Sequence, residues 1–358
     1  MQHPDVVIAG AGVLGLSLAL ELRRRGRNVL VLDRETPGLA SRAAAGMLAA
    51  HDPHNPPALR PLAALALELY PAYLDQIRSG SGHPVPIHTE HILEPGPGGH
   101  PGHTLLPALA TTAGNFILRP EQSLDPRDLH TALRAATRNA GVRFQSTTSD
   151  SDTLSFRPKP PQLHRGGALE SVLAPKPAFF MSEQEAQEHA QFIDCTGAWS
   201  PTHTRPSKGQ MLRVQLPPNT LRLPHNGNTT IRTEHIYLVP RLDGSTLIGA
   251  TVEDAGFDLT PHDTDLDHLR AQAAALLPAA VHAPELERWS GLRPRTPDDL
   301  PILGELAPNH YVANGLFRNG ILLAPAVARV MAQLLTNEPT TIPLAPFSPD
   351  RPAPTLSR

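Results

Sequence analysis

Residues 5–33 read Asp5-Val-Val-Ile-Ala-Gly10-Ala-Gly12-Val-Leu-Gly15-Leu-Ser-Leu-Ala-Leu-Glu-Leu-Arg-Arg-Arg25-Gly26-Arg-Asn28-Val-Leu-Val-Leu-Asp33. An apolar run of strand length leads into Gly-x-Gly-x-x-Gly, a helical pattern follows, and a second apolar run ends in an acid. This order is typical of a βαβ unit that binds a dinucleotide. An ordinary βαβ unit with a glycine-rich turn is the alternative.

Each position of this motif has a physical role. Gly10 allows the tight turn, Gly12 lets a pyrophosphate approach the backbone, and Gly15 allows the helix to pack closely on the strand. Asp33 would accept hydrogen bonds from ribose hydroxyls. The stretch therefore predicts a Rossmann-like nucleotide-binding domain.

Composition limits the classes of protein. The chain of 358 residues is long enough for two domains, and its 31 basic and 34 acidic residues are evenly mixed, which argues against a nucleic-acid partner. Its single cysteine, Cys195, excludes an internal disulfide and fits a reducing cytoplasm. The histidines of 88–103 lie in predicted loops without an ordered third ligand, so no metal is expected.

The N-terminal apolar segment is not expected to be a signal peptide or a membrane span. It is short, contains three glycines and has no basic region ahead of it, whereas a spanning helix needs about 20 apolar residues. We expect a soluble, cytoplasmic protein without a membrane partner.

A second pattern begins after residue 208. Runs at 211–216, 235–240 and 246–252 predict three strands, the last two joined by a turn at Asp243-Gly244. They indicate a second domain with an antiparallel sheet, followed by a helix over 266–277.

Other segments are shorter or less regular. Residues 62–77 and 126–140 predict helices, and 169–173 and 191–195 predict strands. Residues 79–103 are rich in Pro, Gly and His and show few periodic runs.

Two arginines lie beside Gly and Pro in apolar segments near the end of the chain. Arg293 follows Gly291-Leu292, and Arg318 precedes Gly320, where an apolar helical run begins. A guanidinium in apolar surroundings needs an anion or other acceptors, and its planar fork suits a carboxylate. A helix beginning at Gly320 could also face negative charge. Two structural ion pairs are the alternative.

Several motifs together resemble the D-amino-acid-oxidase family of flavoproteins, and within it the glycine oxidase branch linked to thiamine biosynthesis. After the N-terminal fingerprint, the motifs that carry the resemblance are 41–48, 194–200, 237–241, 249–251, 291–294 and 317–325. The resemblance spans nearly the whole chain, although 79–122 and 146–190 match poorly.

The resemblance implies an α/β plus α+β fold with a Rossmann-like FAD-binding domain of the GR2 type and an antiparallel-sheet substrate domain. The FAD-binding domain would comprise residues 1–80, 123–207 and 288–345, the substrate-binding domain 81–122 and 208–287, and a Pro-rich tail 346–358.

It also implies site residues. Tyr237 and Arg293 would be catalytic and bind substrate together with Arg318 and Met47. FAD, held without a covalent bond, would contact Gly10, Gly12, Val13, Leu14, Gly15, Asp33, Arg34, Ser41, Arg42, Ala45, Gly46, Met47, Leu48, Thr196, Gly197, Leu316, Phe317, Arg318, Asn319, Gly320, Ile321 and Leu322.

The implied reaction is oxidative deamination of glycine, sarcosine or a small D-amino acid. Hydride would pass to flavin N5, and molecular oxygen would be reduced to hydrogen peroxide; the assembly would be a homotetramer. The alternatives are an FAD-dependent D-amino-acid dehydrogenase with a non-oxygen acceptor, a flavin-binding protein without activity, and a nicotinamide-dependent dehydrogenase. The small residues of 44–48 disfavour the last.

Three positions depart from the branch. Members of the branch often carry an acid a few residues after the Gly-Met-Leu segment; here the chain reads Asp52-Pro53, which leaves the contact to the substrate amine open. Leu316 stands where a histidine is expected before Phe317, and Val252 replaces a larger residue expected after Gly-Ala-Thr. The preference for glycine therefore stays open.

Overall fold

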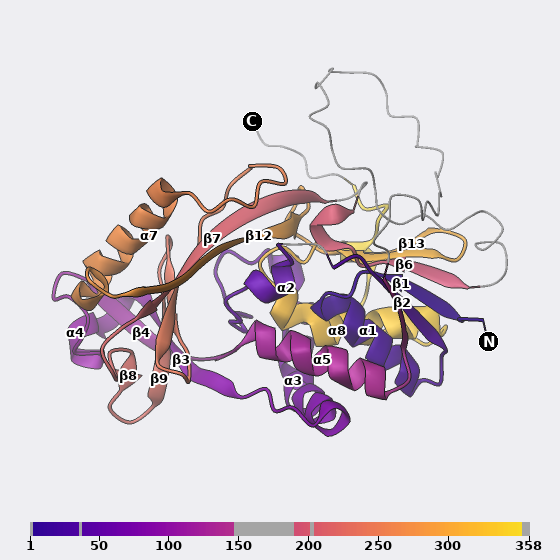
Figure 1. Cartoon of the computed structure of the whole chain (residues 1–358), viewed down its shortest axis with the longest axis horizontal. Helices are drawn as coiled ribbons and strands as arrows, with labels where there is room; N and C mark the ends of the chain where they lie inside the picture. The colour runs from indigo at the N-terminus through magenta and orange to yellow at the C-terminus, as the bar shows by residue number, and fades with distance from the viewer. Residues whose placement is uncertain (1–2, 36–37, 147–189, 201–203, 353–358) are drawn as a thin grey trace, which may run out of the picture.

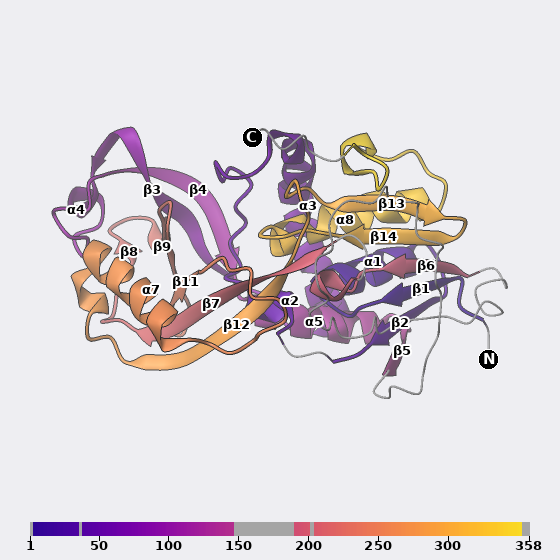
Figure 2. The ribbon, with the colours of Figure 1, turned by 90° about the horizontal axis from the view of Figure 1, so that it is seen from above.

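The computed structural model describes residues 3–35, 38–146, 190–200 and 204–352. These residues form two lobes, one around a six-stranded sheet and one around an eight-stranded sheet (Figures 1 and 2). The short helix α2 (Ala40–Ala43) lies where the lobes meet. The predicted fold class is thereby confirmed.

The six-stranded sheet contains the N-terminal motif. Its strand order is β13-β14-β6-β1-β2-β5, parallel throughout except for the antiparallel pair β13 and β14. The strands are β1 (Val6–Ala9), β2 (Val29–Asp33), β5 (Arg143–Ser146), β6 (Gln191–Asp194), β13 (Ile302–Ala307) and β14 (His310–Asn314). Parallel strands place their carboxyl ends at one edge, where nucleotides bind in such sheets.

Four helices lie on one side of this sheet (Figure 1). They are α1 (Val13–Arg24), α3 (Arg60–Ser81), α5 (Pro126–Asn139) and α8 (Gly320–Leu335). Helix α8 is apolar and buried along most of its length, so it forms the centre of the first core. The Tyr70 hydroxyl of α3 donates a 2.8 Å hydrogen bond to the Ile321 carbonyl, which fixes α3 against the first turn of α8.

The eight-stranded sheet forms the second lobe. Its path is β12-β7-β11-β10-β9-β3-β4, with β8 paired to β9, and all neighbours are antiparallel except β3 and β9. The strands are β3 (Ile87–Pro101), β4 (Asn115–Leu124), β7 (Arg205–Gln215), β8 (Arg222–Leu223), β9 (Gly227–Arg232), β10 (Tyr237–Pro240), β11 (Ser245–Gly249) and β12 (Glu285–Arg295). Helices α4 (Gly102–Leu105) and α7 (Asp263–Leu276) belong to this lobe. Short 3-10 turns lie at Pro57–Leu59, Gly197–Trp199, Pro278–Ala280 and Ala345–Phe347.

The structure differs from the sequence-based expectation in three places. Strand β3 occupies the segment with few periodic runs; its pairing with β4 shifts register three times, which obscures alternation. The expected boundary at residue 288 falls inside β12. In the expected tail, Phe347 is buried and Arg351 pairs with Asp298 at 2.7 Å, so these residues pack on the first lobe.

The strand expected at 169–173 lies outside the described residues. In the part of the chain that the structure describes, no helix combines the length and apolarity needed to cross a membrane.

Candidate active site

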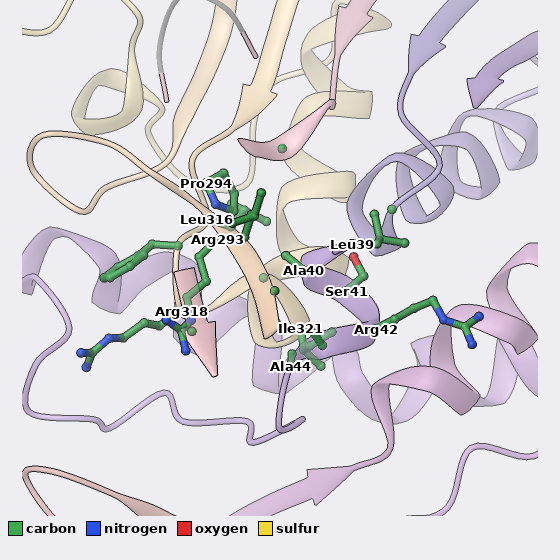
Figure 3. Close-up of a pocket in the computed structure, with 18 of the residues that line it drawn as sticks. Leu39, Ala40, Ser41, Arg42, Ala44, Arg293, Pro294, Leu316, Arg318 and Ile321 are labelled. Atoms are coloured by element: carbon green, nitrogen blue, oxygen red, sulfur yellow. The ribbon is translucent and has the colours of Figure 1, made fainter. Parts of the chain in front are cut away.

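A cavity of about 800 Å³ is lined by both lobes. It is bordered by Asp33 at the end of β2 and by Tyr237 and Arg293 from the second sheet. Figure 3 shows Ser41 and Arg42 on one side of the view and Arg293 with Arg318 on the other. The cavity therefore joins the predicted nucleotide motif to the two predicted arginines.

The glycine turn brings two backbone segments closer than side chains would permit. A Cβ atom at Gly15 would lie 2.0 Å from the Gly10 carbonyl oxygen, and Gly10 itself has φ +106°. The first turn of α1 has no acidic residue, and Ser41 Oγ accepts a 2.9 Å hydrogen bond from the Val13 amide. The turn thus leaves the α1 N-terminus beside the cavity, where a phosphate is favoured.

Helix α5 supports both parts of the nucleotide motif. His130 Nε2 lies 2.9 Å from the Ala11 carbonyl, and Arg134 Nη1 lies 2.5 Å from Asp33 Oδ2. Burial lowers the pKa of His130, so the neutral ring can donate this hydrogen bond. With Arg138, these residues recur every four positions and line the cavity. The sequence alone did not predict these contacts, because the four-residue spacing indicates a cavity wall only once α5 is known to lie here.

The N-terminus of α8 meets the cavity at the turn before it. Asn319 and Gly320 line the cavity, and the first turn of α8 has no acidic residue. The Phe317 amide donates to the Pro294 carbonyl at 3.0 Å, and Asn319 Nδ2 donates to Asn55 Oδ1 at 2.8 Å. The turn is therefore fixed next to strand β12 and the loop before α3.

Arg293 presents to the cavity a charge that no described carboxylate contacts directly. Its Nη1 donates to the carbonyls of Thr251 at 3.0 Å and Lys208 at 3.4 Å, and its side chain lies beside Tyr237. Among the described residues, no carboxylate lies within 4.0 Å of the guanidinium nitrogens. Burial lowers its pKa, but an arginine remains charged in proteins. Arg293 thus forms no ion pair with the described residues, and the alternative of a structural ion pair does not hold for it.

Tyr237 lies beside Arg293 and stays protonated. Burial raises the pKa of the Tyr237 hydroxyl, while the charges of Arg293 and Arg318 act in the opposite direction. The hydroxyl also lies 3.7 Å from Met211 Sδ. Arg318 is exposed, with its guanidinium 5.5 Å from the Phe317 ring centre. Tyr237 and Arg293 are therefore neighbours inside the cavity, whereas Arg318 adds its positive charge from the exposed rim.

A buried ionic cluster adjoins this pair. Arg232 lies opposite Tyr237 across β9 and β10, and it pairs with Glu94, with Glu121 at 2.9 Å and with Asp52 at 3.8 Å. Burial raises the pKa of Glu121 to about 7. Asp52 and Arg232 also line the cavity. Asp52 was a candidate from the sequence, but Arg232 was not, because its three acidic partners come from three separate segments of the chain.

Most of the expected cofactor contacts line the cavity. The residues of the expected set that do so are Gly10, Gly12, Leu14, Asp33, Arg34, Ser41, Arg42, Ala45, Gly46, Met47, Thr196, Gly197, Leu316, Phe317, Arg318, Asn319, Gly320 and Ile321. Val13, Gly15, Leu48 and Leu322 are not among the lining residues; they are buried beneath its wall. The two expected substrate contacts from the second lobe, Tyr237 and Arg293, line it as well.

The cavity fits a dinucleotide that carries a flat ring system. Small side chains at Ala40 and Ala43–Ala45 leave its wall open, and two helix N-termini favour negative groups. Among the described residues, no three His, Cys, Asp or Glu side chains gather as metal ligands. The fold and cavity thus define a dinucleotide-binding oxidoreductase of two lobes.

Comparison with known proteins agrees with this class of oxidoreductase. The family described as DAO, FAD dependent oxidoreductase, matches residues 5–334, and the chain belongs to this family. The expected resemblance is confirmed, and FAD is the cofactor of the family.

Individual relatives are similar over nearly all of this chain. The bifunctional protein ThiO/ThiG of Trichormus variabilis is 33% identical over 93% of this chain, which spans only about half of that relative, 53% of its length. The glycine oxidase of Geobacillus kaustophilus is 29% identical over 96% of each chain. The crystal structure of glycine oxidase from Geobacillus kaustophilus superposes with a TM-score of 0.80 at 27% identity, covering 98% of this chain and 99% of that one.

Proposed function

We propose that the protein is an FAD-dependent oxidase that deaminates glycine or another small amino acid, such as sarcosine or a small D-amino acid. The observation that carries the proposal is the Arg293 guanidinium beside the Tyr237 hydroxyl, without a described carboxylate in direct contact, in a cavity continuous with the nucleotide motif. A guanidinium fork binds a carboxylate through two parallel hydrogen bonds. The similarity to a glycine oxidase supports the same substrate class.

The residues around the cavity divide the tasks of holding FAD. Asp33 would accept hydrogen bonds from the ribose hydroxyls, the α1 N-terminus would bind the pyrophosphate, and residues 44–47 and 316–321 would hold the ring, since all of these segments line the cavity. Bound FAD supplies, at N5, an acceptor for the hydride that leaves the substrate Cα. The thiol of Cys195 is buried and its pKa is raised by burial, which suits non-covalent binding.

We propose that Arg293 and Tyr237, which line the same cavity, orient the substrate. Arg293 binds the carboxylate and the Tyr237 hydroxyl donates to it, which fixes Cα relative to the ring. No protein base needs to reach Cα, because the hydrogen leaves as hydride. For glycine the overall balance is glycine, O2 and water giving glyoxylate, ammonia and H2O2; sarcosine would release methylamine instead of ammonia.

A peroxide-coupled screen tests the proposal. The purified protein, reconstituted with FAD, is given glycine, sarcosine, D-alanine and L-alanine, with heat-inactivated protein as control. We expect peroxide from at least one of the first three. Protein that takes up no FAD contradicts the proposal. Turnover only with an artificial electron acceptor would instead support the alternative, a dehydrogenase that does not use oxygen.

The resemblance also supports a cytoplasmic homotetramer that serves thiamine biosynthesis. Light scattering of the FAD-loaded protein measures its mass in solution. A strain that lacks the gene should require added thiamine, and growth without thiamine would contradict this role.

A further inference from the structure

Strand β7 presents a Lys208-Gly209-Gln210 triplet directly beneath Arg293. Alternation along the strand places Gly209 on the cavity side, where its missing side chain leaves room for the Arg293 guanidinium. Lys208 and Gln210 point to the opposite face and are both fully buried. A buried ammonium is costly unless a partner neutralises it, so Lys208 must have a specific partner.

That partner belongs to residues 251–262, here called the capping segment. Lys208 Nζ lies 2.6 Å from Asp258 Oδ2, 2.5 Å from the Thr260 carbonyl and 3.9 Å from Glu253 Oε2. The same interaction lowers the pKa of Asp258 well below its usual range. The backbones of Lys208 and Glu253 exchange two hydrogen bonds of 3.0 Å. Lys208 therefore holds the capping segment at its middle and at its end.

Gln210 also fixes the same segment, and it contacts the helix α7 that follows it. Its Nε2 donates to Glu253 Oε1 at 2.8 Å and to Asp265 Oδ2 at 2.7 Å, and its Oε1 accepts from the His262 amide at 2.6 Å. Its backbone amide donates to Thr251 Oγ1 at 2.8 Å. The polar atoms of these two β7 side chains are thus used to hold the capping segment and the first turn of α7.

The capping segment in turn contacts Arg293. The Thr251 carbonyl accepts the 3.0 Å hydrogen bond from Arg293 Nη1, and the Lys208 carbonyl lies 3.4 Å from the same atom. The next residue, Val252, lines the cavity. The side of the guanidinium that faces away from the cavity is therefore held by this segment, which leaves the other side for an anion.

We propose that Lys208 is a positioning residue for carboxylate binding: through Asp258 and the Thr251 carbonyl it aims the Arg293 guanidinium at the substrate. The inference rests on the proposed function, since it assigns Arg293 to the substrate carboxylate. Lys208 itself touches neither substrate nor FAD.

The test measures carboxylate binding separately from turnover. Acetate is titrated into the FAD-loaded protein and its binding is followed by the change in flavin absorbance. We expect Lys208→Met to raise the acetate Kd and the KM of the amino acid roughly ten- to hundredfold, with kcat at saturation and bound FAD nearly unchanged. Lys208→Arg, which keeps a cation, should restore much of the affinity. Arg213→Met is the matched control, because Arg213 lies on β7 but pairs with Asp243 away from the capping segment.

Acetate affinity equal to wild type in Lys208→Met overturns the inference. If that variant does not fold, Asp258→Asn decides, because Asp258 is accessible from solvent and its substitution removes the partner charge without emptying the core. Unchanged acetate affinity in Asp258→Asn also overturns the inference. Wild-type protein that binds FAD but neither binds acetate nor oxidises an amino acid refutes the proposed function instead.

Discussion

A Cβ atom at position 209 would lie 2.1 Å from Nη2 of Arg293. The contact is far shorter than atoms allow, so Gly209→Ala must displace the guanidinium, whose flexible stem can move. We expect the KM for the amino acid to rise about a hundredfold while the protein still binds FAD. Steady-state kinetics and flavin absorbance measure the two effects. Gly244→Ala, strained by φ +85° in a distant hairpin turn, should lower the Tm and leave KM unchanged; the reverse pattern would contradict the assignment.

Removal of the Arg293 guanidinium should abolish carboxylate binding. Two charge-assisted hydrogen bonds are lost, each of about 1.5–3 kcal/mol, so the KM should rise roughly a hundredfold to ten-thousandfold in Arg293→Ala. Arg318→Ala is the comparison, since Arg318 is exposed at the rim and should change KM less. Equal effects of the two substitutions would show that the arginines act as one clamp.

The Tyr237 hydroxyl should contribute one hydrogen bond to the substrate. Tyr237→Phe keeps the ring that packs beside Met211 and removes only the donor, so we expect kcat/KM to fall about tenfold. Because burial raises the pKa of Tyr237, the wild-type hydroxyl should not limit activity by deprotonation at neutral pH. A variant with wild-type kcat/KM would assign Tyr237 to packing alone.

Arg134 should matter for FAD and not for the substrate. In Arg134→Met, the Asp33 carboxylate loses its 2.5 Å partner, and its orientation toward the ribose is no longer fixed. We expect the FAD Kd, measured by flavin fluorescence, to rise about tenfold, with KM for the amino acid unchanged at saturating FAD. Arg78→Met on the exposed surface of α3 is the control and should leave the FAD Kd unaltered.

The ionic cluster around Arg232 should make stability depend on pH. The pKa of Glu121 is raised to about 7 by burial, so the folded state binds its proton more tightly than the unfolded state. The contribution of Glu121 to stability is therefore full below its unfolded pKa of about 4.5 and is lost as pH rises through 7. Glu121→Gln cannot titrate, and its Tm should fall less than that of wild type between pH 4.5 and 7.5. Parallel Tm curves would show that Glu121 stays ionised.

The sequence predicted the parts of the fold whose structure depends on residues close together in the chain. The βαβ unit from Asp5 to Asp33 carries its own turn, helix period and terminal acid, and it folds as expected. Strand β3 was missed because irregular pairing, Pro and Gly remove its alternation. The joint position of Tyr237 and Arg293 followed from resemblance, since the 55 residues between them include strand β11 and helix α7.

The supporting residues could not be foreseen for a different reason. Arg134 and Lys208 act on Asp33 and Asp258, 101 and 50 positions away in sequence. Such pairs exist only after the helices and sheets have assembled, and no sequence motif around either residue indicates the pairing. A helix arginine and a strand lysine are ordinary until their partners are known.

The cavity is walled by segments from Gly10 to Ile321, and this has a thermodynamic consequence. Unfolding either lobe destroys this cavity, in which we propose that FAD binds, so the free energy of FAD binding would stabilise both lobes. A ligand that binds only the folded state adds RT ln(1 + [L]/Kd) to stability, about 2.7 kcal/mol at a concentration of 100 Kd. The cellular supply of FAD should therefore set how long this chain survives as well as how fast it turns over.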